Sequence, residues 1–172
     1  IYDMQCNILP FCRRKCMNYN EAIDNNKVDF GNMPPQPFLL GLLSAFDNRY
    51  QAIADSYFGE ITWKQFFAII CINLCKEPPT INELADVMGS SHQNVKQILL
   101  KLERKGFVQM LVDENDKRKQ RIRLTKECMN FCEKNDEESK AIIYKIFEGI
   151  DENDLLNSIK TLLRMEENLK NI

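Results

Sequence analysis

Amide and cationic side chains share one face of a short helix predicted between Ser91 and Arg104. Glutamine and asparagine can form paired hydrogen bonds with adenine, and lysine can bind guanine or a phosphate. Ser91 would cap this helix, and the free N–H groups behind it suit a phosphate oxygen. The residues that we expect to contact a nucleic acid here are Ser91, His92, Gln93, Asn94, Lys96, Gln97 and Lys101.

An ordinary solvated face is the alternative interpretation of this helix, because exposed helix faces are commonly polar. Ser91 would then act only as a cap. His92 is the single histidine of the chain, and a lone histidine is more often a surface or DNA-contacting residue than a metal ligand or a base. The turn before the helix and the charged connection after it favour nucleic-acid contact.

That connection joins two short strands predicted at 107–112 and 120–124. It is too long and too charged for a tight turn, so we expect it to project as a wing. Arg118 would enter a minor groove or grip the backbone, while Asp116 orients Arg118 rather than touching DNA. Further cations that would add sequence-independent affinity are Lys117, Lys119 and Arg121.

Charge is distributed unevenly along the chain. The whole chain has a net charge of −2, whereas residues 91–123 hold nine Lys or Arg and four Asp or Glu, a net of +5. The remaining residues therefore carry −7. A basic segment in an otherwise acidic protein is typical of a surface that binds a polyanion, although a solvated charged face would have the same composition.

Apolar spacing and caps identify the elements that must position these side chains. The apolar face of the helix predicted between Ser91 and Arg104 consists of Val95, Ile98, Leu99 and Leu102. Gly106 ends that helix. Before it, Thr80 and Glu83 form a capping box for a short helix that Gly89 ends. A short helix, a turn with glycine and a second helix are the plan of a helix-turn-helix.

Longer helices flank this unit, starting with residues 38–57, whose apolar seam is typical of packing against another helix. Core packing and a dimer seam are both open for it. Thr62 with Gln65 caps a further helix, and Thr125 and Asp151 cap the two last ones. Two long terminal helices exceed what one winged domain needs, which suggests packing between molecules.

The expected fold is mainly α with a small β-hairpin wing. It is a winged helix-turn-helix lobe with long N- and C-terminal dimerisation helices. The divisions are an N-terminal arm at 1–36, a dimerisation helix at 37–58, a DNA-binding domain at 59–125 and C-terminal dimerisation helices at 126–172.

Several classes of protein are disfavoured. There is no Gly-rich phosphate loop, nucleophile elbow or second histidine, so we expect neither an enzyme nor a cofactor. The chain contains no run of 18 apolar residues, so no membrane span is expected. No leader is recognisable either, so a cytoplasmic location is expected. Seven cysteines, an odd number, fit reduced thiols rather than a disulfide framework.

The N-terminal arm contains Cys6, Cys12 and Cys16. Their spacing matches no standard zinc pattern, so no metal is expected. Met17 is a candidate natural start, which would place residues 1–16 upstream of it. The prolines before residue 38 are expected to stop any structure ahead of the next helix.

The order of these elements resembles the MarR family (multiple antibiotic resistance regulators) over roughly residues 38–172. The resemblance is carried by a threonine-led first helix, Leu-Ala, glycine at the turn, a second helix ending Leu-Glu-x-x-Gly, and Asp-x-Arg then Leu-Thr in the wing. These residues read TINELADVMGSSHQNVKQILLKLERKGFVQMLVDENDKRKQRIRLT, and GIDENDL at 149–155 is also similar to the family's link into its last helix. Two positions depart from the pattern. Met110 removes a possible wing charge, and Cys128 replaces a frequent glycine without consequence inside a helix.

The resemblance implies a homodimer, held by the terminal helices, with two winged lobes on a pseudo-palindromic DNA operator. It implies regulation of transcription, with repression expected, relieved by a small ligand or an oxidant. The family often places ligands between dimer helices and lobe, where the candidates for a small aromatic effector are Phe46, Tyr50, Trp63 and Phe67. Core packing is the alternative for each. Two other functions stay open: a winged-helix module that binds a protein, and a metal or redox sensor that uses the cysteines of the N-terminal arm.

Overall fold

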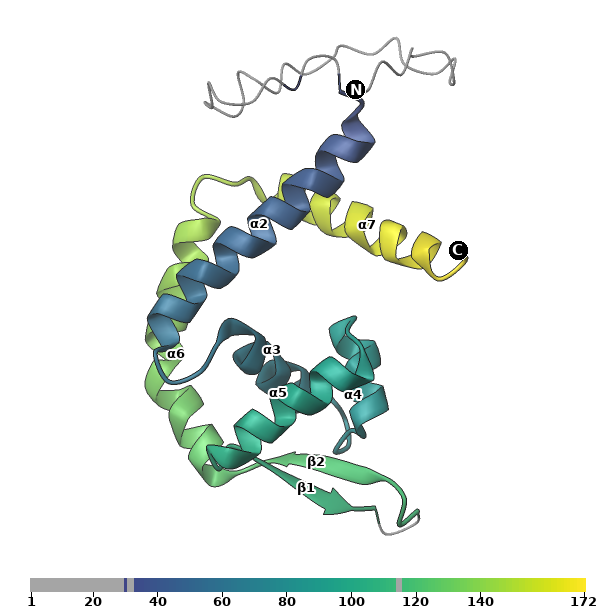
Figure 1. Cartoon of the computed structure of the whole chain (residues 1–172). Coiled ribbons are helices and arrows are strands. Elements are labelled where there is room, and N and C mark those ends of the chain that lie inside the picture. Colours follow the sequence, from purple (N-terminus) through teal and green to yellow (C-terminus); the bar gives the residue numbers. More distant parts are fainter. Residues whose placement is uncertain (1–29, 31–32, 114–115) are drawn as a thin grey trace. The chain divides into compact units, whose positions relative to one another are not determined.

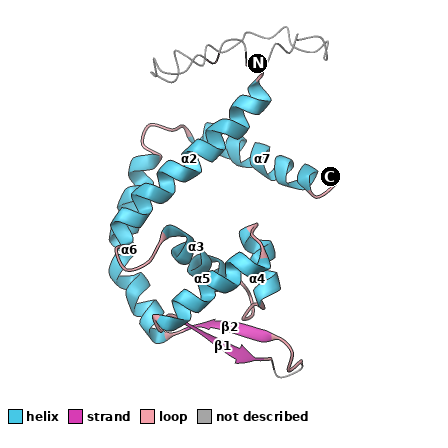
Figure 2. Cartoon of the chain, viewed as in Figure 1, coloured by secondary structure: helices cyan, strands magenta, loops and turns pink. Residues whose placement is uncertain are grey.

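The computed structural model describes residue 30, residues 33–113 and residues 116–172. In chain order the elements are α2 (Pro35–Phe58), α3 (Trp63–Leu74), α4 (Ile81–Met88), α5 (His92–Arg104), β1 (Val108–Val112), β2 (Gln120–Leu124), α6 (Lys126–Ile146) and α7 (Glu152–Leu169). Figure 2 shows the two strands as one hairpin among helices. The predicted class, mainly α with a β-hairpin wing, is confirmed.

Two compact units make up the chain, Ile1–Ile53 and Ala54–Ile172, and the division falls inside α2. α2 begins at Pro35, three residues before the expected start at Phe38. The prolines do not stop this helix because they occupy its first turn, where backbone N–H groups have no partner within the helix. The expectation that they end all structure before Phe38 is therefore corrected.

The second unit contains a lobe in which α3, α4 and α5 pack against one another and carry the hairpin (Figure 1). β1 contacts α5, and β2 contacts α3 and α4. We call these five elements the winged lobe. Its fully buried large side chains include Leu84, Val95, Leu99, Leu102 and Ile122. The predicted apolar face of α5 is confirmed, since Ile98 is buried as well.

Both predicted capping boxes are present in the winged lobe. Thr62 Oγ1 accepts the N–H of Gln65 at 3.3 Å, and Gln65 Oε1 accepts the N–H of Thr62 at 3.2 Å. Thr80 and Glu83 repeat this exchange at 3.3 and 2.7 Å. Gly89 ends α4 with φ of 59°, a left-handed conformation that a β-carbon would strain. The lengths and ends of α3 and α4 are thus encoded locally.

The hairpin is attached to the segment before α4. β1 and β2 pair antiparallel, with Met110 opposite Ile122, and Met110 packs against the buried core. Thr80 forms an isolated antiparallel bridge with Arg121. The N–H of Ile122 donates to the carbonyl of Pro79 at 2.9 Å. The base of the wing therefore has a fixed place beside the start of α4.

The last two helices begin at the predicted caps. Thr125 Oγ1 accepts the N–H of Cys128 at 3.2 Å, and Asp151 caps α7. Near the start of α6, the Phe131 ring lies 5.0 Å from that of Phe107, centroid to centroid. α7 has no buried residue. Within the described parts of the chain, no helix is long and apolar enough to cross a membrane.

Candidate nucleic-acid interface

The first half of α5 presents the predicted contact residues to solvent. Ser91 caps the helix by accepting the N–H of Asn94 at 3.3 Å. The side-chain amide of Asn94 donates to Ser90 Oγ at 2.9 Å, which leaves a second N–H and the carbonyl oxygen for another partner. The exposed residues on this face are His92, Gln93, Asn94, Lys96, Gln97 and Lys101. Their exposure agrees with the sequence, while their role stays a prediction.

The starts of α5 and α4 and the wing line one hollow of about 270 Å³. From α5 come His92 and Lys96, and from the wing come Arg118 and Lys119. The other lining residues are Thr80, Ile81, Asn82 and Gln120. We call this group of eight the interface hollow. It brings four predicted contact residues together and adds the start of a helix.

The electrostatics of the interface hollow suit an anion. Three cations line it, Lys96, Arg118 and Lys119, and the described lining contains no carboxylate. The start of α4 adds the positive end of a helix dipole. The sequence did not point to Asn82 or Gln120 as contact residues. The capping box placed Asn82 in the first turn of α4, but only tertiary packing brings that turn to the wing.

The wing tip carries an exposed, oriented arginine. Arg118 Nε lies 3.1 Å from Asp116 Oδ1, and Nη2 lies 3.3 Å from Oδ2. The backbone N–H of Arg118 also donates to Asp116 Oδ1 at 3.1 Å. These hydrogen bonds from Arg118 lower the pKa of the Asp116 carboxyl. Since the Arg118 side chain is 91% exposed, the pair orients it without burying it, as predicted for Asp116.

Arg121, which was expected to add sequence-independent affinity, is bonded to three oxygens of its own chain. Its Nε donates to Asp113 Oδ2 at 2.5 Å, and its Nη1 donates to Glu83 Oε2 and to the Pro78 carbonyl, both at 3.1 Å. The reason is the burial of Asp113, which is 6% exposed, because a buried carboxylate requires a charged partner. The contribution of Arg121 to sequence-independent affinity stays a prediction.

Glu83 belongs both to a helix cap and to this ion pair. The backbone N–H of Thr80 is the main cause that lowers the pKa of the Glu83 carboxyl, followed by the Thr80 hydroxyl, with a smaller contribution from Arg121. The Arg121 guanidinium has its pKa raised, chiefly by its hydrogen bond to Asp113. The ionised forms of Glu83 and Arg121 are therefore stabilised by this arrangement.

The four aromatic candidates for an effector site form two pairs, each within one unit. Phe46 and Tyr50 stack in the first unit, with ring centroids 6.2 Å apart. Trp63 and Phe67 stack in the second unit at 5.9 Å. Each pair is separated by one helical turn, which is the ordinary spacing of neighbours on a helix face. Effector binding by these four residues stays a prediction.

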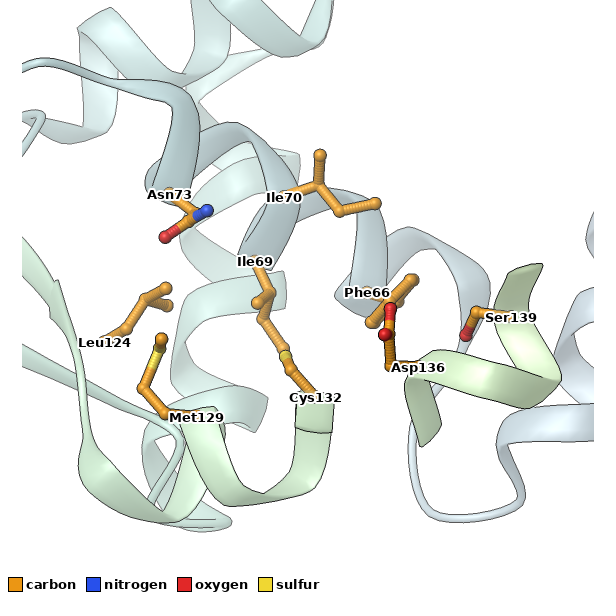
Figure 3. Close-up of a pocket in the computed structure, with 9 residues that line it drawn as sticks. All are labelled: Phe66, Ile69, Ile70, Asn73, Leu124, Met129, Cys132, Asp136 and Ser139. Atoms are coloured by element: carbon orange, nitrogen blue, oxygen red, sulfur yellow. The ribbon is translucent and has the colours of Figure 1, made fainter. Parts of the chain in front are cut away.

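A pocket of about 200 Å³ lies between α3, the end of β2 and α6 (Figure 3). Its apolar lining consists of Phe66, Ile69, Ile70, Leu124, Met129 and Cys132, and its polar lining of Asn73, Asp136 and Ser139. None of the four aromatic candidates lines it. Sequence reasoning missed this pocket because three separate elements contribute to it, and each lining residue alone resembles ordinary core or surface.

Four cysteines lie in the described residues, and all are free thiols: Cys71, Cys75, Cys128 and Cys132. Burial raises the pKa of Cys71 and Cys132, and it raises the pKa of Cys128 to about 12. Thiols with raised pKa values stay protonated at neutral pH and are poor nucleophiles. Across the residues that the structure describes, no group of three or more His, Cys, Asp or Glu could hold a metal ion. Cys6, Cys12 and Cys16 lie outside those residues.

Most of the winged lobe, without β2, matches a known family in sequence. Residues 61–119, which run from the cap of α3 to the wing, match the sequence model of the MarR family. No curated protein matches the chain.

Solved structures share the fold well beyond that segment. A MarR/EmrR family transcriptional regulator from Acinetobacter sp. ADP1 is 14% identical with a TM-score of 0.72, covering 81% of this chain and 100% of that one. The S. aureus MepR–DNA complex is 21% identical with a TM-score of 0.68, covering 74% and 95%. Streptococcus pneumoniae FabT in complex with DNA is 22% identical with a TM-score of 0.58, covering 80% and 99%.

The family match and the shared fold agree with the resemblance found in the sequence. The matched residues contain the capping boxes, the exposed face of α5 and the wing-tip cations. The fold likeness adds the flanking helices. Residues 61–119 therefore match the MarR family, and the chain has the winged helix fold of a solved MarR/EmrR family transcriptional regulator.

Proposed function

We propose that this chain represses transcription by binding, as a homodimer, to a pseudo-palindromic operator in double-stranded DNA. The observation that carries the proposal is the interface hollow, where side chains of α5 and the wing lie together around the start of α4. A DNA phosphate has the charge and the hydrogen-bonding capacity to occupy it. Two relatives of the same fold, MepR and FabT, were solved with DNA, and we extend DNA binding to this chain.

The two parts of the interface have different tasks in this proposal. The start of α5 enters a major groove, where Gln93, Asn94 and Gln97 bond base edges, adenine above all. His92 and Lys96 contact bases or phosphates at the same place, and Ser91 presents the helix start to a phosphate. Arg118 reaches a minor groove or the backbone. Lys101, Lys117 and Lys119 add affinity that depends on salt and not on sequence.

Dimerisation is the second part of the proposal, and α7 provides its main support. This helix has no buried residue although its sequence is amphipathic. Its exposed apolar side chains are Leu156, Ile159, Leu162, Leu163 and Leu169. A contiguous apolar face is seldom left in solvent, and a second copy of the chain would cover it. The two α5 helices would then enter successive major grooves about 34–36 Å apart.

Release by a small aromatic effector is the third part. The pocket of Figure 3 supports it, because the pocket is mainly apolar, with Asn73, Asp136 and Ser139 as hydrogen-bonding groups. Leu124 is the last residue of β2 and Met129 belongs to α6. A ligand between them would therefore contact both the base of the wing and the helix after it. A cytoplasmic location, with access to DNA, completes the proposal.

The proposal is tested by selecting bound fragments from a random duplex library with the full chain. The expected winners contain two inverted half-sites whose centres lie about one helical turn apart, about 10–10.5 base pairs. The matched control is the variant Gln93→Ala with Gln97→Ala, which should keep non-specific binding but lose the enrichment. Binding to the selected duplex should also fall steeply as salt rises.

The contrary results are distinct. Failure to enrich any sequence, together with a partner that binds independently of salt, would favour a winged-helix module that recognises a protein. Enrichment of a single half-site would keep sequence-specific DNA binding and reject the dimer on a pseudo-palindrome.

A further inference from the structure

We infer that Arg121 is a positioning residue for the wing-tip Arg118, acting through Asp113 and Asp116 without touching DNA. The inference rests on the proposed function, because it assigns to Arg121 a role in DNA binding by the wing. It replaces the phosphate contact that the sequence suggested for this arginine.

The positioning chain consists of four hydrogen-bonded residues. Arg121 Nε donates to Asp113 Oδ2 at 2.5 Å. The other carboxylate oxygen of Asp113, Oδ1, accepts the backbone N–H of Asp116 at 2.9 Å. Asp116 in turn holds Arg118 through both of its carboxylate oxygens. The two carboxylate oxygens of Asp113 thus accept from two parts of the wing, the side chain of Arg121 on β2 and the backbone of Asp116 in the connection.

Arg121 also bonds, through Nη1, to the segment that leads into α4 and to α4 itself. Its Nη1 donates to the Pro78 carbonyl and to Glu83 Oε2, and Glu83 also caps α4. The backbone of Arg121 pairs with Thr80. One guanidinium therefore links the wing tip to the start of α4, the first helix of the helix-turn-helix that contains α5.

Burial separates the roles of the two arginines. Arg118 is 91% exposed at the tip, whereas Arg121 is 31% exposed and bonded to three oxygens of its own chain. A phosphate contact by Arg121 would compete with Asp113, whose burial makes loss of its cation costly. A planar guanidinium can also serve Asp113 and Glu83 at once, which a lysine amine on a flexible stem cannot do in the same geometry.

The first experiment measures the positioning chain without DNA. The N–H of Asp116 donates to Asp113 Oδ1, and the N–H of Lys119 donates to the carbonyl of Asp116 at 2.8 Å. In the variant Arg121→Met both N–H groups should lose protection from hydrogen exchange, because the Asp113 carboxylate that holds Asp116 is no longer fixed. The matched control is Arg123→Met, which removes an exposed cation from the same strand and should leave these two amides unchanged. Unchanged protection of both amides in folded Arg121→Met would overturn the inference, whatever happens with DNA.

The second experiment measures the consequence for the selected operator duplex. We expect Arg121→Met to weaken binding about fivefold or more. The log–log salt slope should change by less than half of the roughly 0.9 units that one lost phosphate contact produces. In an Arg118→Ala background, Arg121→Met should weaken binding less than about twofold, because the residue that it positions is gone. A general loss of stability would weaken both backgrounds equally.

A full slope loss with additive effects would show that Arg121 contacts a phosphate itself, and this would overturn the inference. Arg121→Lys keeps the charge and provides a variant that should fold if Arg121→Met does not. It should lose the protection of Asp116 in part and remain coupled to Arg118. Wild-type protein that binds no duplex would instead reject the proposed function and, with it, the DNA-binding role of Arg121.

Discussion

Arg118 and Asp116 form a two-point ion pair at the tip of the wing, with Nε–Oδ1 and Nη2–Oδ2 distances of 3.1 and 3.3 Å. An exposed pair of this kind contributes little to the stability of the fold. Its effect is on orientation, because a planar guanidinium held at two points cannot swing freely. The pair therefore presents an arginine in a defined direction before any ligand arrives.

Replacement of Arg118 by alanine should weaken operator binding and flatten its salt dependence. One lost contact with DNA phosphate reduces the log–log slope by about one unit. Fluorescence anisotropy titrations between about 50 and 200 mM salt measure both quantities. The matched control is Lys134→Ala, which removes an exposed cation from α6. Equal slopes and affinities for Arg118→Ala and wild type would reject the role of Arg118.

Replacement of Leu99 by alanine should destabilise the winged lobe by about 2–5 kcal/mol, because Leu99 has no solvent exposure and its loss leaves a cavity. Denaturation by urea, followed by circular dichroism, gives the free energy of unfolding. The matched control is Leu100→Ala, one residue along α5, where the side chain is only half-buried. Similar small losses for both variants would contradict the assignment of Leu99 to the core.

Local patterns in the sequence were sufficient for most of the winged lobe. The spacing of Val95, Ile98 and Leu102 identified the buried face of α5, and residues adjacent in the chain fixed its ends. The capping box of Thr80 and Glu83 acts over three residues, so it could be predicted without any tertiary information. The exposure of the polar face of α5 followed from its apolar spacing, because the side chains opposite the buried face must point to solvent.

Arg121 marks the limit of such reasoning. Strand alternation predicts that its side chain points away from Ile122, but alternation does not identify the residues that contact it on that face. Its partners Asp113 and Glu83 lie eight and 38 residues away in the chain, so only the folded hairpin brings the three together. The predicted start of α2 was wrong for a different reason. The prolines were treated as helix breakers, although the first turn of a helix tolerates them, and α2 begins at Pro35.

Replacement of Leu163 by glutamate should dissociate the proposed dimer. The Leu163 side chain is 65% exposed on α7, and a charge at a buried dimer contact would be desolvated without a partner. Sedimentation at micromolar concentration should show a dimer for wild type and a monomer for Leu163→Glu. The matched control, Thr161→Glu, places the same charge elsewhere on the exposed surface of α7 and should stay dimeric. Monomeric wild-type protein would reject dimerisation.

The buried thiol of Cys128 should make stability fall at alkaline pH. Burial, followed by the neighbouring Cys132, raises the pKa of Cys128 in the folded protein from its ordinary value of 9.0 to about 12. Above pH 9 the unfolded chain releases a proton that the folded chain retains, so the free energy of unfolding falls as pH rises. This contribution is fully present below pH 9 and is lost progressively up to about pH 12, at up to about 1.4 kcal/mol per pH unit.

Urea denaturation of wild type and of Cys128→Ala between about pH 8 and 11 measures this contribution, because the variant has no thiol to titrate at that position. Cys128→Ala should be less stable at pH 8, where it lacks packed atoms, yet its stability should decline less steeply with pH. Leu99→Ala is the matched control, since it is destabilised but keeps the thiol, and it should follow the wild-type slope. Parallel curves for wild type and Cys128→Ala would show that Cys128 does not titrate differently in the folded and unfolded states.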